Sequence, residues 1–365
     1  MLRATVLFAA CLLAAGFSSL PGLPATLAAH LVAPDGTSPL LPPEPIDAAL
    51  ARLRDRDGRV TTRDGVEVYW RAIDPAAYAL RMSWPQGLGV ADTFPDLDFE
   101  VPDAPAAAPR GTVVLLHGWM MHGDSMLPWA LRLGEAGYRT IAIDLRNHGR
   151  SGQAPSGYGT REAGDVVDVV AALRERGEIV GPLHVLGVSY GAATAIFAGA
   201  DPALGAESVV AMESFAVADA AIRDMVPYML TDAPAPPSAW LTRQWLRWRL
   251  SDSVLDAAID QAGTALDLPL DGVDVVAALA EVRCPLLVHG DADRHVPVAH
   301  GRALAASAPH ARYIELPGED HLSLPMQLDE LAPAVLDWFD HPGCARDTGM
   351  ARSSGPGATT APETT

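Results

Sequence analysis

The sequence contains few cysteines, only three among 365 residues, and they are far apart. Cys11 lies in an apolar N-terminal stretch, Cys284 opens a strand-like run, and Cys344 lies near the C-terminus. These positions do not form the paired spacings of a disulfide framework or of a structural zinc site. With 49% hydrophobic residues, the chain is instead expected to fold around a packed apolar core.

Positive charge is also scarce. Lys and Arg number 26 against 45 Asp and Glu, which gives a formal net charge of −19. Charge of this sign repels phosphate backbones and anionic head groups at long range, so we expect no nucleic acid partner. The histidines form no His-Glu-x-x-His motif and no dense cluster with aspartates. We therefore predict no metal site and no cofactor.

The N-terminus has the pattern of an export signal. An apolar run follows Arg3 and is too short and interrupted for a membrane span, while the small residues Ala28 and Ala29 offer cleavage sites. We therefore predict a signal peptide over residues 1–29 and an exported protein, periplasmic or secreted, with no stable membrane span after processing. An uncleaved membrane anchor remains an alternative, as does a lipid anchor at Cys11, although the apolar residues after Cys11 argue against the lipid anchor.

Short apolar runs alternate with helix-like stretches through most of the chain. The predicted strands are 112–116, 140–143, 183–188, 208–212, 285–288 and 313–316. The predicted helices are 126–136, 161–176, 192–199 and 296–307. This alternation predicts an α/β fold, a mostly parallel central sheet covered by helices on both faces. Functional loops then lie at the carboxyl ends of the strands.

Other segments precede, interrupt and follow this core. Residues 46–56 have helical spacing, and the alternating run 66–70 is expected to enter the sheet antiparallel. The predicted divisions are an N-terminal linker with the first strands at 30–110, a core at 111–215 and 282–341, a helical cap at 216–281, and a disordered tail at 342–365. The cap contains Trp240, Trp245 and Trp248, which we expect to bury the cap against the sheet or to contact a ligand.

Gly187-Val188-Ser189-Tyr190-Gly191 directly follows one of the predicted strands and precedes a predicted helix. A strand that turns at once into a helix holds its turn residue in a strained conformation, and flanking glycines permit the close backbone approach. This pattern exposes Ser189 as a nucleophile.

A serine hydroxyl needs a base and an acid to become a nucleophile. Asp293 and His321 follow the last two predicted strands, and the order Ser189, Asp293, His321 suits an open parallel sheet with a nucleophile turn. Asp291 competes with Asp293 for the role of acid, because both lie in one loop. The alternatives to His321 are His289, His295, His300 and His310, whose positions are more typical of surface or structural histidines.

Acyl transfer also needs donors for the oxyanion of its tetrahedral intermediate. His117-Gly118-Trp119 leaves a strand with a glycine that allows close approach to the site. We expect the backbone amides of Trp119 and Tyr190 to form the oxyanion hole, with Met120 as the substitute for Trp119.

As a set, these motifs resemble the α/β-hydrolase superfamily over residues 111–340. The set comprises His117-Gly118, the run from Asp144 to Ser151, the Gly187 to Gly191 turn, Gly290 to Asp293, and His321. One departure is Asn147, which stands where glycine is usual. The serine at the turn disfavours the haloalkane dehalogenases and epoxide hydrolases of this fold, which carry an aspartate there.

The resemblance implies a serine hydrolase of the carboxylesterase-like or serine aminopeptidase-like branch. We expect a small-molecule ester or amide as the substrate, an ester first, with an apolar acyl or alcohol group because Trp119, Met120, Met121 and the cap tryptophans are apolar. Amidase, aminopeptidase, thioesterase and acyltransferase activities would use the same residues. A noncatalytic binding protein of the same fold is the competing class.

Overall fold

The computed structural model contains an eight-stranded sheet in the order β1-β2-β6-β5-β7-β8-β9-β10. It describes residues 22–34, 37, 38, 41, 43–84, 94–102, 108–233 and 237–341. In sheet order the strands are β1 (Asp55–Thr61), β2 (Glu67–Ile73), β6 (Arg139–Ile143), β5 (Thr112–Leu116), β7 (Leu183–Val188), β8 (Ser208–Met212), β9 (Pro285–Gly290) and β10 (Arg312–Leu316). β1 and β2 are antiparallel, and the strands from β6 to β10 are parallel. The predicted fold class is confirmed.

The apolar runs predicted the strands well. Those at 112–116, 183–188 and 208–212 match β5, β7 and β8 at both ends, because each strand is buried on both faces. Strand β1 was missed. Its sequence DRDGRVT is polar and lies half exposed at the sheet edge, and the helix predicted over 46–56 occupies Pro43–Leu50 instead.

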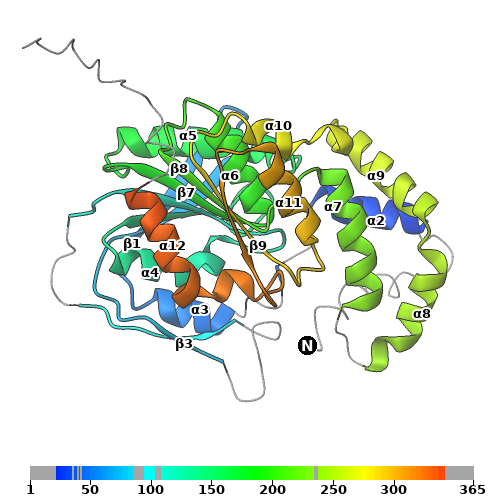
Figure 1. Cartoon of the computed structure of the whole chain (residues 1–365), viewed down its shortest axis with the longest axis horizontal. Coiled ribbons are helices and arrows are strands. Elements are labelled where there is room, and N and C mark those ends of the chain that lie inside the picture. Colours follow the sequence, from blue (N-terminus) through cyan, green and yellow to red (C-terminus); the bar gives the residue numbers. More distant parts are fainter. Residues whose placement is uncertain are drawn as a thin grey trace, which may run out of the picture.

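Helices cover both faces of the sheet and form two apolar cores (Figure 1). One layer contains α5 (Thr160–Glu175), α6 (Tyr190–Ala200), α10 (Val275–Leu279) and α11 (Val298–Ser307). The other contains α3 (Pro43–Leu50), α4 (Leu127–Glu135) and α12 (Leu328–Asp340). A separate hairpin pairs β3 (Arg81–Ser83) with β4 (Asp96–Asp98). Helix α6 follows the Ser189 turn directly, so the packing of α6 against β7 and β8 fixes the position of that turn.

The segment between β8 and β9 leaves the sheet and returns to it at one point. Its two ends are joined by backbone hydrogen bonds, from Ala218 N–H to Val273 O at 3.1 Å and from Val275 N–H to Ala216 O at 2.9 Å. Between these ends lie α7 (Ala218–Pro227), α8 (Trp240–Arg249) and α9 (Asp252–Leu266), grouped at one end of the molecule in Figure 1. The cap predicted at 216–281 falls on this segment, and its last helix, α10, packs on α6.

The three cap tryptophans do not bury the cap against the sheet. Trp240, Trp245 and Trp248 are 61%, 44% and 77% exposed, as is Leu241 at 72%. The apolar contacts of α8 are made by Leu246, which is buried, so the tryptophans lie on the other side of the helix. The prediction that these tryptophans bury the cap against the sheet is therefore wrong.

Most of the predicted signal peptide lies outside the described residues. Its last part forms helix α2 (Leu23–Val32), which packs along α9 with Leu23, Leu27 and Leu31 buried. The Tyr158 hydroxyl donates to Leu31 O at 2.7 Å and ties this helix to the core. Cleavage at Ala28 or Ala29 would remove more than half of α2 and uncover an apolar face of the cap.

Cys284 is buried directly before β9. Both other cysteines lie outside the described residues, as does the predicted tail at 342–365. In the part of the chain that is described, no helix has the length and apolar character needed to cross a membrane.

Candidate active site

Ser189 lies at a strained turn between β7 and α6. Its φ is 55° and its ψ −115°, a conformation that residues with side chains rarely adopt. A Cβ atom on Gly187 would lie 2.1 Å from Gly191 O, and one on Gly191 would lie 2.3 Å from Leu116 O. Neither position therefore has space for a side chain. The two glycines allow the turn to form, as the sequence predicted.

The structure brings Ser189, His321 and Asp293 into one hydrogen-bonded row. His321 Nε2 lies 2.9 Å from Ser189 Oγ, and its Nδ1 lies 2.7 Å from Asp293 Oδ2. An ionised carboxylate only accepts hydrogen bonds, so Nδ1 donates to Asp293 and Nε2 is left to accept from the serine hydroxyl. Asp291 is exposed and accepts from Gly318 N–H instead, which separates the two candidate acids.

Asp293 is held ionised by its surroundings. Burial by itself would raise its pKa, but the charge on His321, the nearby His289 ring at 3.6 Å and the hydrogen bond from His321 hold the pKa well below its usual range. Its Oδ1 accepts from the amides of His295 and Val296, at 2.8 and 2.9 Å. Oδ1 is therefore fixed by the loop, and Oδ2 is directed at His321.

The other candidate histidines have different partners. His289 and His310 each hydrogen-bond a backbone carbonyl, at 2.8 and 2.9 Å, and His300 contacts a carboxylate of α7 at 3.1 Å. The ring of His295 lies 5.1 Å from that of His321. Burial, and then the charge on His321, lower the pKa of His295 to about 4, so it stays neutral.

Glu213 is a site residue that the sequence analysis missed. It follows β8 with a φ of 57°, is fully buried, and places Oε2 3.7 Å from His321 Nδ1. Neither carboxyl oxygen has a hydrogen-bond partner among the described residues. Burial raises its pKa well above the usual value, and the charge on Asp293 raises it further, so its surroundings favour the protonated acid. Its position directly after a buried strand was the available signal.

Glu213, Asp293 and His321 are also close enough to share a metal ion, the one such group among the described residues. The His321 ring, however, already uses Nδ1 toward Asp293 and Nε2 toward Ser189. A metal ligand needs a free lone pair on an imidazole nitrogen. The observed hydrogen bonds therefore leave neither ring nitrogen of His321 free to bind an ion.

The loop after β5 lies beside Ser189. A Cβ atom on Gly118 would be 3.6 Å from Ser189 Cβ, and a turn from Gly118 to Met121 places Met120 at a φ of 61°. The Trp119 ring packs against Tyr158 and Tyr190, with centroids 5.8 and 4.9 Å apart. Tyr190 is the first residue of α6, so its N–H has no acceptor within the helix. The roles of Trp119, Tyr190 and Met120 in an oxyanion hole remain predictions.

His117 holds this loop against the next one. Its Nδ1 contacts Gly118 O at 2.8 Å, and its Nε2 accepts from Leu145 N–H at 2.9 Å. Burial, and then the charge of His148, lower the pKa of His117 to about 3. The imidazole is therefore neutral, with one nitrogen donating and the other accepting.

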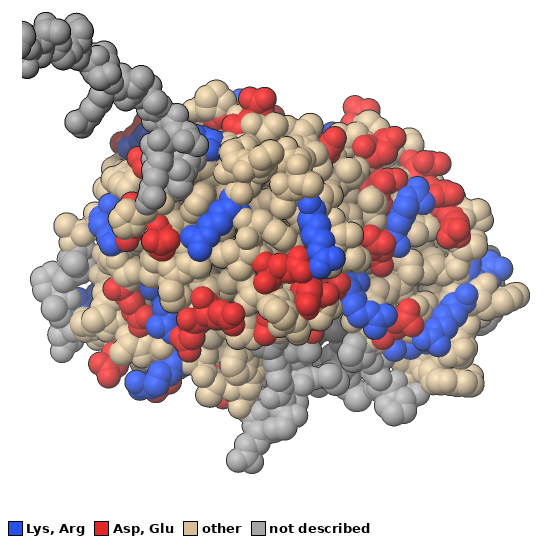
Figure 2. Space-filling model, in the orientation of Figure 1, with Lys and Arg blue, Asp and Glu red and all other residues tan. Residues whose placement is uncertain are grey.

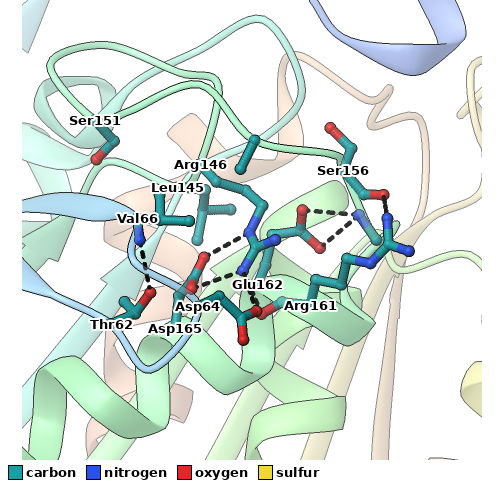
Figure 3. Close-up of polar contacts among 12 residues, drawn as sticks. Thr62, Asp64, Val66, Leu145, Arg146, Ser151, Ser156, Arg161, Glu162 and Asp165 are labelled. Carbon is teal, nitrogen blue, oxygen red and sulfur yellow. Dashed lines mark hydrogen bonds and ion pairs between the residues drawn. The ribbon is translucent and has the colours of Figure 1, made fainter. Parts of the chain in front are cut away.

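The loop after β6 is anchored by a buried ion pair, shown in Figure 3. Arg146 makes two 2.7 Å hydrogen bonds to Asp165 of α5, and both side chains are buried. Glu162 accepts from the amides of Gly157 and Gly159, at 3.0 and 2.9 Å. Two-point contacts of this kind fix both distance and orientation. They hold in place the loop whose His148 ring packs against Trp119 and Tyr190.

Asn147 has a φ of 67°, which explains why glycine is usual at this position. The asparagine side chain offsets the strain locally. Its Oδ1 accepts from Ala154 N–H at 2.8 Å, and its amide donates to Ser156 Oγ at 2.9 Å. The substitution thus leaves the loop ordered and lies away from Ser189.

A charged cleft of about 500 Å³ lies beside this site, lined by Arg223, Asp224, Pro227, Tyr228, Asp232, Asp293, Arg294 and Pro297. Neither Ser189 nor His321 lines it. The cleft therefore borders the acid of the row rather than the nucleophile.

This chain is similar to several known proteins, in sequence or in structure. A monoacylglycerol lipase of Mycolicibacterium smegmatis is 30% identical over 218 residues, which are 55% of this chain and 76% of that protein. A non-heme haloperoxidase of Rhodococcus erythropolis is 27% identical over 257 residues, 62% and 92% of the two chains. An esterase structure from Pyrococcus furiosus superimposes with a TM-score of 0.59 at 18% identity, covering 85% of this chain and 97% of that one.

A model of the alpha/beta hydrolase family matches residues 113–334, more than half of the chain. The match begins in β5 and ends within α12, so it spans the parallel strands together with the loops that carry Ser189, Asp293 and His321. The chain therefore belongs to the alpha/beta hydrolase family and is a hydrolase.

Proposed function

We propose that this hydrolase cleaves carboxylic esters through an acyl-enzyme formed on Ser189. The observation that carries the proposal is the row Ser189 Oγ, His321 Nε2 at 2.9 Å, and His321 Nδ1 at 2.7 Å from Asp293. A nucleophile within hydrogen-bond reach of a base, with the base oriented by an acid, is the arrangement that acyl transfer requires.

In the proposed reaction, Ser189 Oγ attacks the ester carbonyl while His321 accepts the serine proton. The imidazolium then returns that proton to the leaving alcohol as the carbon–oxygen bond breaks. A water molecule, deprotonated by His321, hydrolyses the acyl-enzyme and releases the acid. Asp293 keeps the ring in the required tautomer and stabilises its cationic form, and the amides of Trp119 and Tyr190 are proposed to hold the oxyanion.

An ester is proposed first because the proteins similar to this chain include a lipase and an esterase. An apolar acyl or alcohol group is supported only by Met120 and Met121 on the turn beside Gly118, since the cap tryptophans face solvent. Amide or thioester cleavage and acyl transfer to another acceptor would use the same row of residues.

The test combines a fluorophosphonate label with a panel of esters of graded chain length and aminoacyl amides. Labelling and ester hydrolysis are expected in the wild type and absent in Ser189→Ala. Ser307→Ala, at the end of α11 and remote from the site, is the matched control and should keep both. A folded wild type that takes no label would exclude serine chemistry, and hydrolysis of the amides alone would replace esterase by amidase.

We also propose that the protein is exported. The apolar run after Arg3 supports this, because such a run is typical of a signal peptide. Burial of Leu23 and Leu27 against the cap favours cleavage before residue 23 rather than at residue 29. Sequencing the N-terminus of the mature protein tests this: a start at residue 30 would contradict the proposed position.

A further inference from the structure

Helix α8 directs its largest apolar side chains away from the protein. Leu241, Trp245 and Trp248 are spaced i, i+4 and i+7, so they share one face of the helix, here called the α8 stripe. Together with Trp240 they are all of the exposed large apolar side chains in the described part of the chain. Scattered apolar residues are ordinary on a surface, but a concentration on one helix marks a contact site.

The charge of α8 differs from that of the rest of the molecule. The helix carries Arg243, Arg247 and Arg249 and no acidic residue, although the chain as a whole has a formal net charge of −19. Arg249 is exposed beside the α8 stripe, whereas Arg247, which is also exposed, pairs with Asp232 at 2.8 Å. The neighbouring helix α9 exposes Asp252, Asp256 and Asp260. Figure 2 shows basic side chains near the α8 end of the cap and acidic ones over α9.

We propose that the α8 stripe binds the surface of a lipid layer that carries anionic head groups. Tryptophan rings settle where one side is apolar and the other is wet, which is the level of lipid head groups. An arginine beside such a helix face, here Arg249, can bind the head-group phosphates. The acidic face of α9 is repelled by the same surface, so the charge distribution orients the cap with α8 toward the lipid and α9 away from it.

A second copy of the chain fits the stripe less well. A stable dimer buries about 800 Å² on each partner. A tryptophan side chain offers at most about 250 Å², and the three on α8 are each only partly exposed. A two-fold contact over the stripe would also bring two copies of Arg249 into one interface, where their like charges repel each other.

The test is cosedimentation of the full chain with vesicles of phosphatidylcholine containing about one fifth phosphatidylglycerol. Trp245→Gln/Trp248→Gln removes the apolar character of the stripe. The matched control, Trp245→Leu/Trp248→Leu, keeps that character with the same number of substitutions. Both variants retain Leu246, which packs α8 on the cap. Hydrolysis of a short, soluble ester or fluorophosphonate labelling reports that each variant is folded.

The glutamine variant is expected to bind at least about tenfold more weakly than the wild type, since two large apolar groups no longer leave water. The leucine variant should keep most of the affinity. Arg249→Gln should reduce binding by about fivefold on vesicles with phosphatidylglycerol. Equal binding by the glutamine variant and the wild type overturns the proposal, because any affinity of residues 1–21 for lipid is common to both.

The same measurement is repeated in the Ser189→Ala background, where binding should be unchanged. Lipid binding and ester hydrolysis can therefore fail separately. Analytical ultracentrifugation without vesicles tests whether the stripe binds a second copy of the chain. A wild-type dimer that the glutamine variant abolishes would assign the stripe to a second copy and overturn the lipid surface.

Discussion

The strand ends around Ser189 and helix α8 of the cap differ in which side chains they bury. At the strand ends, polar side chains such as Asp293 are buried and fixed by two or more hydrogen bonds. On α8, the large apolar side chains of Trp245 and Trp248 face solvent. Folding thus fixes the side chains of the site, whereas it leaves the large apolar side chains on the outer face of α8 in water. Substitutions at the strand ends should therefore change catalysis or stability, whereas substitutions on the outer face of α8 should change binding at the surface.

The largest effect is expected from Asp293→Asn compared with Asp291→Asn. Loss of the Asp293 carboxylate removes the acceptor that fixes the His321 tautomer, and kcat should fall by about 10⁴-fold. Asp291 contacts the Gly318 amide away from the row, so its variant should keep kcat within a few-fold. Steady-state hydrolysis of a soluble ester measures both, and similar losses in the two variants would refute the choice of acid.

A comparable contrast is available between two glycines. Gly191→Ala would place Cβ 2.3 Å from Leu116 O, so we expect a destabilisation of about 3 kcal/mol or more, or no folded protein. Gly164→Ala on α5 meets open space, and should stabilise the chain by about 0.5–1 kcal/mol. Urea unfolding followed by circular dichroism gives both values. Equal stability of the two variants would show that the turn tolerates a side chain.

Within α8, the two faces should respond differently to substitution. Leu246→Ala leaves a cavity under the helix and should cost about 2–4 kcal/mol. Trp248→Gln changes an exposed position and should alter the free energy of unfolding by less than about 0.5 kcal/mol. Both are measured by the same urea transitions. A large loss in Trp248→Gln would mean that the tryptophan packs in solution, and that the α8 stripe is not free to bind.

The last contrast concerns Glu213 and is seen as a pH dependence. Its pKa is raised in the folded state, so the unfolded chain ionises first as the pH rises above the ordinary value of 4.5. Stability from this group is complete below that value and is lost as the pH rises toward the folded pKa. Glu213→Gln removes the loss, so the variant should gain on the order of 1 kcal/mol relative to the wild type between pH 5 and 7.

Urea unfolding at a series of pH values measures this difference. Glu330→Gln, on the exposed side of α12, is the control and should run parallel to the wild type. If the difference in the free energy of unfolding between Glu213→Gln and the wild type does not grow with pH, Glu213 is ionised in the folded protein.

The sequence by itself determined the core strands, the Ser189 turn and the order of the three residues of the row. Each of these depends on local pattern, an apolar run or a glycine flanking a strand end, and such patterns persist whatever the chain packs against. Strand β1 has no such run and was missed, because its place is set by pairing with β2.

Only the tertiary structure decided which groups meet. Glu213 approaches His321 because β8 and β10 lie on either side of β9 and end at the same edge of the sheet, an arrangement that no short sequence window contains. Asp293 rather than Asp291 faces the histidine because of the way its loop turns. The tryptophans of α8 face outward because Leu246 takes the packed side of the helix. Each outcome depends on contacts between distant segments, and the free energy of those contacts is set by the whole fold rather than by neighbours in sequence.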